Sequence, residues 1–72
     1  MDEFLSSNGW FQTGACGCSP KRYSWKNDSI PNTVIKTIPT RQTWQLFEYD
    51  RLTMNGQNTS LETQYNNKYK QQ

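Results

Sequence analysis

The chain has 72 residues and a mass of 8.5 kDa, which limits it to one domain, and a domain of this size buries a modest fraction of its surface. Only 32% of the residues are apolar and the mean hydropathy is −1.05, so core residues are scarce, whereas the 14% of aromatic residues argues against a disordered chain. The formal net charge of +2 and the pI near 8.7 are mild for a dedicated nucleic-acid-binding domain, and no apolar run is long enough to predict a membrane-spanning helix. We therefore expect a small aromatic core with polar arms that become ordered against a partner.

Residues 1–15 are expected to form an N-terminal arm. Phe4 and Leu5 are placed to anchor a short helical turn, and Trp10 and Phe11 follow in a stretch too polar to pack by itself. This adjacent aromatic pair either inserts into a groove of a neighbouring subunit or folds back onto the core of its own chain. The sequence leaves both alternatives open.

The next segments read as loops and strands. Residues 14–20 hold two glycines and a proline, which predicts a tight loop. In residues 21–26 aromatic side chains alternate with polar ones, which predicts a short strand with one aromatic and one charged face. Residues 27–32 are expected to form a loop, and the β-branched residues of 33–38 predict the clearest strand. Pro39 either ends this strand or marks it as an edge strand.

Residues 43–56 hold the densest apolar cluster of the chain. The apolar side chains are those of Trp44, Leu46, Phe47, Tyr49, Leu52 and Met54. Asn55-Gly56 predicts a hairpin turn, because both residues tolerate the positive φ of a type I′ turn. The apolar residues fall on both parities, so the stretch forms either one long strand or two strands that meet at a bulge or turn near residues 48–51. A helix is the competing interpretation, which the aromatic and threonine content disfavours.

After Gly56 the pattern changes to one of helical spacing. Thr59 or Ser60 can cap a short helix, with a further strand as the alternative. The residues that form one stripe at intervals of four are Leu61, Tyr65 and Tyr69. Polar residues 66–72 are expected to reach outward as a tail.

These elements together predict a mainly β fold. We expect a small antiparallel sheet or open barrel of three to four short strands, with extended N- and C-terminal arms. The C-terminal part can include a short helix. The boundaries are an N-terminal arm over residues 1–15, a small β domain over 16–65 and a polar C-terminal tail over 66–72. Such a sheet has unpaired edges and too few partners for its faces, which points to assembly with other subunits.

Two cysteines form the weak candidate for a metal site. Cys16 and Cys18 lie one residue apart on a loop and could bind a soft metal or cycle between dithiol and disulfide. A structural zinc site needs four ligands, and the chain has no histidine to complete the set. We therefore favour two small residues in a tight turn, and we expect no metal and no cofactor.

No catalytic constellation is apparent in the sequence. The commonest general base, histidine, is missing, and Glu48 and Asp50 read as part of a solvated face rather than a catalytic carboxylate pair. No glycine-rich segment is followed by the Lys-Ser/Thr of a phosphate-binding loop. We expect a protein that is not an enzyme.

Basic and aromatic residues interleave in one segment, which carries the alternative function. Aromatic rings can stack on bases while cations meet phosphates, so this pattern suits single-stranded nucleic acid. The residues are Lys21, Arg22, Tyr23, Trp25 and Lys26. The competing interpretation is a small sheet with an aromatic core and a solvent-exposed face that carries the Lys and Arg side chains.

The preferred function is that of a small structural or interaction subunit of a larger assembly. The high content of Asn, Gln, Tyr and Lys is typical of AT-rich microbes and their phages, so we expect a bacteriophage virion component in a capsid-decorating, collar or tail position. Its location would be the virion, or the host cytoplasm before assembly, with protein subunits as partners and no membrane. The expected contact residues are Trp10, Phe11, Tyr65 and Tyr69.

Overall fold

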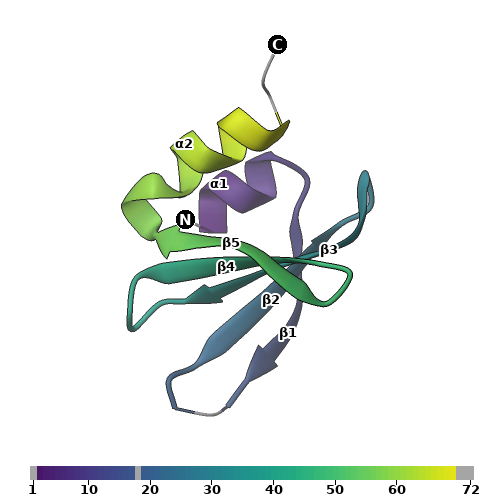
Figure 1. Ribbon diagram of the computed structural model, residues 1–72. Coiled ribbons are helices and arrows are strands. Elements are labelled where there is room, and N and C mark those ends of the chain that lie inside the picture. The colour runs from purple at the N-terminus through teal and green to yellow at the C-terminus, as the bar shows by residue number, and fades with distance from the viewer. Residues whose placement is uncertain (1, 18, 70–72) are drawn as a thin grey trace.

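The computed structural model describes residues 2–17 and 19–69, and it shows one five-stranded antiparallel sheet with both helices on the same face (Figure 1). The elements are α1 (Asp2–Ser7), β1 (Phe11–Cys16), β2 (Arg22–Asn27), β3 (Ile30–Ile38), β4 (Thr43–Glu48), β5 (Arg51–Gln57) and α2 (Asn58–Tyr69). The strand order β1-β2-β3-β4-β5 makes every strand a neighbour of the next one in the chain. The predicted mainly β fold with a short C-terminal helix is confirmed, with five strands rather than three or four.

The N-terminal residues fold back onto the core of their own chain, which is the second of the two alternatives for the expected arm. Leu5 of α1 is fully buried and Trp10 is 2% exposed. Helix α1 ends where the Trp10 N–H donates to the Leu5 carbonyl at 3.0 Å, and Gly9 adopts the positive φ of 90° that this ending requires. The turn points Trp10 inward and starts β1 at Phe11.

Two of the expected loops are shorter than predicted. Residues 14–16 continue β1, because Ala15 and Cys16 pair with the first residues of β2, so the pairing rather than the local sequence decides their conformation. Between β2 and β3 the expected loop over 27–32 shrinks to Asp28 and Ser29. The Asn27 side chain closes this turn, since its Oδ1 accepts a hydrogen bond from the Ser29 N–H at 2.9 Å.

The core lies between the sheet and the two helices, and half of its buried residues are aromatic. Its members are Leu5, Trp10, Trp25, Ile35, Trp44, Leu46, Leu61 and Tyr65. All three indole N–H groups have acceptors: Trp10 donates to the Tyr65 hydroxyl at 2.9 Å, Trp25 to Thr37 Oγ1 at 3.1 Å and Trp44 to the Gln57 carbonyl at 3.0 Å. Burying large rings while satisfying their polar atoms lets a short chain build a core from few residues.

The stretch 43–56 forms two strands, and the turn between them is not the predicted one. Tyr49 and Asp50 make the turn, with positive φ values of 53° and 65°, as a type I′ turn requires. The prediction of a turn at Asn55-Gly56 was wrong, because both residues lie inside β5. Gly56 is needed there for another reason: it faces Trp44, and a Cβ at this position would lie 2.7 Å from Ser60 Oγ.

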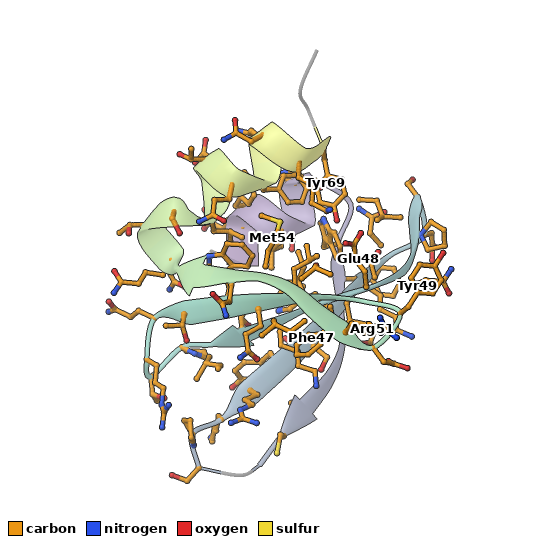
Figure 2. The ribbon with its side chains drawn as sticks, viewed as in Figure 1. Phe47, Glu48, Tyr49, Arg51, Met54 and Tyr69 are labelled. Atoms are coloured by element: carbon orange, nitrogen blue, oxygen red, sulfur yellow. The ribbon has the colours of Figure 1, made fainter. Side chains whose placement is uncertain are left out.

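A bulge in β5 explains why both parities of this stretch are apolar. Leu46 pairs with Met54, but Phe47 pairs with Leu52, so Thr53 is the extra residue. Leu52 and Met54 therefore point to opposite faces of the sheet. Figure 2 shows Met54 on the side of the helices and Phe47 on the other side.

Helix α2 follows β5 directly and confirms the predicted C-terminal helix. Leu61 and Tyr65 are its buried residues, and the Tyr65 and Tyr69 rings lie 4.8 Å apart between centroids. The Tyr65 ring also meets the edge of Phe4 from α1 at 5.3 Å, so the two helices pack side by side on the sheet. Residues 66–69 of the expected tail are helical, and residues 70–72 lie outside the described part of the chain.

Candidate interaction surface

The sheet has one face without helices, which we call the open face. Its residues follow from the register, because side chains directly opposite each other on paired strands point to the same side. Trp25 of β2, Ile35 of β3 and Leu46 of β4 point into the core, so the residues next to each of them along its strand point outward. One row of the open face crosses four strands as Ser24, Lys36, Gln45 and Asn55.

Four apolar side chains lie close together on the open face, and we call them the apolar row. They are Phe11 of β1, Val34 of β3, Phe47 of β4 and Leu52 of β5. Phe11 is 46% exposed and Leu52 47% exposed. Together with Tyr49 in the adjacent turn, these two are the large hydrophobic residues classed as exposed within residues 2–17 and 19–69. A concentration of exposed apolar side chains on one face marks a binding surface more often than scattered ones do.

A groove runs along this part of the open face. It has a volume of about 610 Å³, and its apolar lining comes from Phe11, Val34, Phe47 and Tyr49 together with Ile30 and Pro31 at the start of β3. Lys26, Asp28 and Asp50 also line it, with neutral polar residues between them. An open trough with apolar, polar and charged groups suits the side chains of a partner segment better than an enclosed small molecule.

The opposite end of the open face is basic. Arg22 and Arg41 line a second shallow groove with neutral polar residues, and no carboxylate lines it. These neighbours are Thr43, Gln45, Asn55 and Gln57. Lys36 lies between the two ends, with its Nζ 4.9 Å from the centre of the Phe47 ring. Within the described ranges the ion pair is Lys68 with Glu48 at 3.3 Å, so no cation of the open face forms a close ion pair with a carboxylate of these residues.

The residues predicted for nucleic-acid binding are divided by the sheet. The alternation in β2 is as expected, with one aromatic and one charged face. Trp25 is 5% exposed and Tyr23 packs against the core, so both rings lie on the helix side. Arg22 and Lys26 are exposed on the open face, and Lys21 is exposed in the loop before β2. The rings and the cations therefore do not form one site.

The four expected contact residues also separate. Trp10 and Tyr65 are core residues joined by a hydrogen bond, so neither presents its ring on the surface of the folded chain, and Tyr69, the last residue of α2, is half-buried. Only Phe11 is exposed. Sequence reasoning missed Phe47 and Leu52 as surface residues, although the presence of apolar residues on both parities of 43–56 was the signal for a second apolar face.

Among the described residues, Tyr69 is the group whose pKa departs clearly from its ordinary value. Burial, with the negative charge of Glu48 and the neighbouring Tyr65, raises the pKa of Tyr69 to about 12. Its hydroxyl is buried without a hydrogen-bond partner among the described residues. Glu48 itself binds Lys68 on the helix side, whereas Asp50 lies in the β4–β5 turn, so the two carboxylates do not form a pair.

The cysteines show no metal centre in the described part of the chain. Cys16 is exposed at the end of β1, and Cys18 lies outside the described residues. Residues 2–17 and 19–69 contain no group of three or more His, Cys, Asp or Glu side chains that could hold a metal ion. Neither helix in these ranges has the length and apolar content that crossing a bilayer demands.

No protein-family model, no curated protein and no solved structure matches this chain.

Proposed function

We propose that this protein is a small, non-enzymatic interaction subunit of a larger assembly and that it binds its partner through the open face of its sheet. The observation that carries the proposal is the position of the apolar row. The helices already bury the other face, and the core holds all three tryptophans. Phe11 and Leu52 leave nearly half of their surface in water on the remaining face, and a partner that covers them would remove this apolar surface from solvent.

The charges of the open face favour a different protein over a second copy on this surface. Face-to-face packing of two copies would bring together two surfaces that each carry Arg22, Lys26 and Lys36. Like charges opposed in an interface are costly, whereas carboxylates of a partner would be complementary. The partner we infer therefore presents apolar side chains to the row and acidic side chains to the basic end.

A bacteriophage particle is the assembly that we favour. The composition rich in Asn, Gln, Tyr and Lys supports an AT-rich phage or host, and a short chain with one binding face suits a capsid-decorating, collar or tail position. The protein would then reside in the virion, or in the host cytoplasm before assembly.

Site-specific photo-crosslinking in cells of the source, or in the infected host, tests the proposal. A photoreactive phenylalanine analogue replaces Leu52 on the open face, and the same analogue at Thr63, exposed on α2, is the matched control. We expect one dominant protein adduct from position 52 and none from position 63, identified by mass spectrometry. Equal labelling from both positions, or no adduct from position 52, would refute docking through the open face.

The same experiment separates a protein partner from nucleic acid. An adduct from position 52 that nuclease removes would replace the proposal with the alternative of single-stranded nucleic-acid binding. That alternative has a direct measurement, the fluorescence anisotropy of a labelled single-stranded oligonucleotide. We expect only weak, salt-sensitive binding, in the range of about 10⁻⁴ M that a few unpaired cations give without base stacking.

A further inference from the structure

We propose that β1 pairs with β1 of a second copy of this chain, so that two sheets join edge to edge. Strand β1 is one of the two outer strands of the sheet, and all six of its residues are exposed. It contains no charged residue and no proline. Natural outer strands usually carry a charged residue, a proline, a bulge or a covering element that hinders pairing with another chain. Strand β1 has no charge and no proline, all its residues are exposed, and a bulge at Thr13 is its one such feature among the described residues.

The other outer strand, β5, is less suited to pairing with a second copy. Helix α2 begins directly at its end, and Ser60 and Gln64 lie next to Gly56 on the helix side of the strand. Gln64 also lines a shallow groove with residues 52–55 of β5. Arg51 adds a positive charge at the start of the strand. Pairing with another chain is therefore expected at β1 and not at β5.

The lack of charge on β1 is what makes a second copy a suitable partner. The cations of the open face repel those of another copy, but two uncharged strands can approach each other without repulsion. An antiparallel pair with its two-fold axis between Thr13 and Gly14 is self-complementary, as a two-fold interface requires. In this arrangement Gln12 lies opposite Ala15 of the second copy, and both residues point to the helix side, since they pair with Trp25 and Tyr23 of β2.

The pairing is expected to be weak. Thr13 is the extra residue of a bulge between Gln12 and Gly14, and its Oγ1 donates to the Ser24 carbonyl at 3.4 Å. The bulge bends β1 and limits how many backbone hydrogen bonds a second copy can add. Six residues per strand give a small interface, so we expect a dissociation constant on the order of 10⁻⁴ M. Within an assembly, where copies are held close together, this affinity is sufficient.

A charge-swap experiment tests the pairing. One variant carries Gln12→Lys with Ala15→Lys, and the other carries Gln12→Glu with Ala15→Glu. Light scattering of the full-length wild type should give a mass that rises with concentration from 8.5 kDa toward twice that value. Each variant alone should stay at the monomer mass, because like charges face each other across the axis, and an equimolar mixture of the two should associate again. The variant Ser7→Lys with Thr63→Lys adds the same charge away from β1 and should behave as wild type.

A wild-type chain that stays monomeric up to about ten times the expected dissociation constant would overturn the pairing, as would a mixture that fails to associate. Amide hydrogen exchange of the wild type needs no variant and gives a second reading: exchange in Phe11–Cys16 should slow with concentration while exchange in β5 should not. The inference does not depend on the open face, because Phe47→Thr should leave association unchanged. Loss of partner crosslinking with intact pairing, or the reverse, would separate the two proposals.

Discussion

At the scale of single residues, the core depends on hydrogen bonds between large aromatic side chains. The Trp10 indole donates to the Tyr65 hydroxyl at 2.9 Å, and both side chains are buried. This bond joins the chain segment before β1 to α2, across 55 residues of sequence. Removing the acceptor leaves a buried N–H that water cannot reach.

Tyr65→Phe should therefore lower the free energy of unfolding by about 1–3 kcal/mol, the cost of a buried donor without a partner. Urea denaturation followed by tryptophan fluorescence measures the change. Tyr49→Phe removes a hydroxyl from a side chain that is 75% exposed and should shift the midpoint very little. Equal effects of the two substitutions would contradict the assignment of Tyr65 to the core.

The second residue-scale prediction concerns alkaline pH. The folded chain raises the pKa of Tyr69 from 10.0 to about 12, chiefly through burial, so the folded state favours the neutral phenol. Its contribution to stability is complete below the unfolded pKa and is lost as the pH rises from about 10 to about 12. Wild type should lose unfolding free energy over this window more steeply than Tyr69→Phe. Parallel pH profiles of the two proteins would contradict this account, and ultraviolet titration of the phenolate gives an independent check.

At the scale of elements, the sequence predicted the helices and strands whose spacing of apolar and polar residues is by itself enough to indicate their conformation. The spacing of Leu61, Tyr65 and Tyr69 predicted α2, and the alternation in residues 21–26 predicted β2 with its two faces. Strand β1 was missed because its exposed residues show no alternation of apolar and polar side chains, and its conformation comes from pairing with β2. A local pattern cannot report a hydrogen-bonding partner that lies elsewhere in the chain.

The β4–β5 hairpin shows how tertiary packing overrides a strong local signal. Asn55-Gly56 has the best turn chemistry, yet the chain turns at Tyr49-Asp50, because this register pairs Leu46 with Met54 and brings Gly56 under Trp44. The candidate surface was missed for the same reason. The bulge that separates Leu52 from Met54 follows from the pairing and cannot be read from their spacing of two.

Gly56→Ala tests this interpretation of the hairpin. A Cβ at position 56 would lie 2.7 Å from Ser60 Oγ, so Ser60 must rotate and lose its hydrogen bond to the Gln57 carbonyl at 2.9 Å. We expect a loss of about 1–3 kcal/mol in unfolding free energy, measured by urea denaturation. Gly14→Ala is the matched control, since a Cβ at Gly14 would meet nothing within 4 Å. It should be neutral or slightly stabilising, and a larger loss at Gly14 than at Gly56 would contradict the packing described.

At the scale of the whole molecule, both helices lie on one face of the sheet, so the two faces differ in their role. The covered face holds the three tryptophans and stabilises the fold, and the open face holds the apolar row and the basic end. Composition indicated correctly that apolar residues are scarce. It could not show that the chain completes its core by folding residues 2–10 over the sheet, since that depends on how Leu5 and Trp10 fit between α2 and the strands.

Two adjacent residues of β4, Leu46 and Phe47, point to opposite faces, so substitutions there test the two faces separately. Leu46 is 2% exposed in the core, whereas Phe47 points outward and pairs with Leu52. Leu46→Thr should cost about 2–5 kcal/mol of unfolding free energy, because it removes buried apolar volume and buries a hydroxyl. Phe47→Thr introduces a β-branched residue with good strand propensity at a partly buried site outside the core and should cost about 1 kcal/mol.

The central claim is that the open face binds the partner while the other face stabilises the fold. The most direct test places the photoreactive analogue at position 52 and compares the yield of the protein adduct between the Phe47→Thr variant and the protein with Phe47 intact. We expect the yield to fall at least about tenfold, the effect of losing roughly 1.4 kcal/mol of binding free energy, while circular dichroism shows an unchanged fold. An undiminished yield in the folded variant would contradict the claim that the apolar row carries the function of this protein.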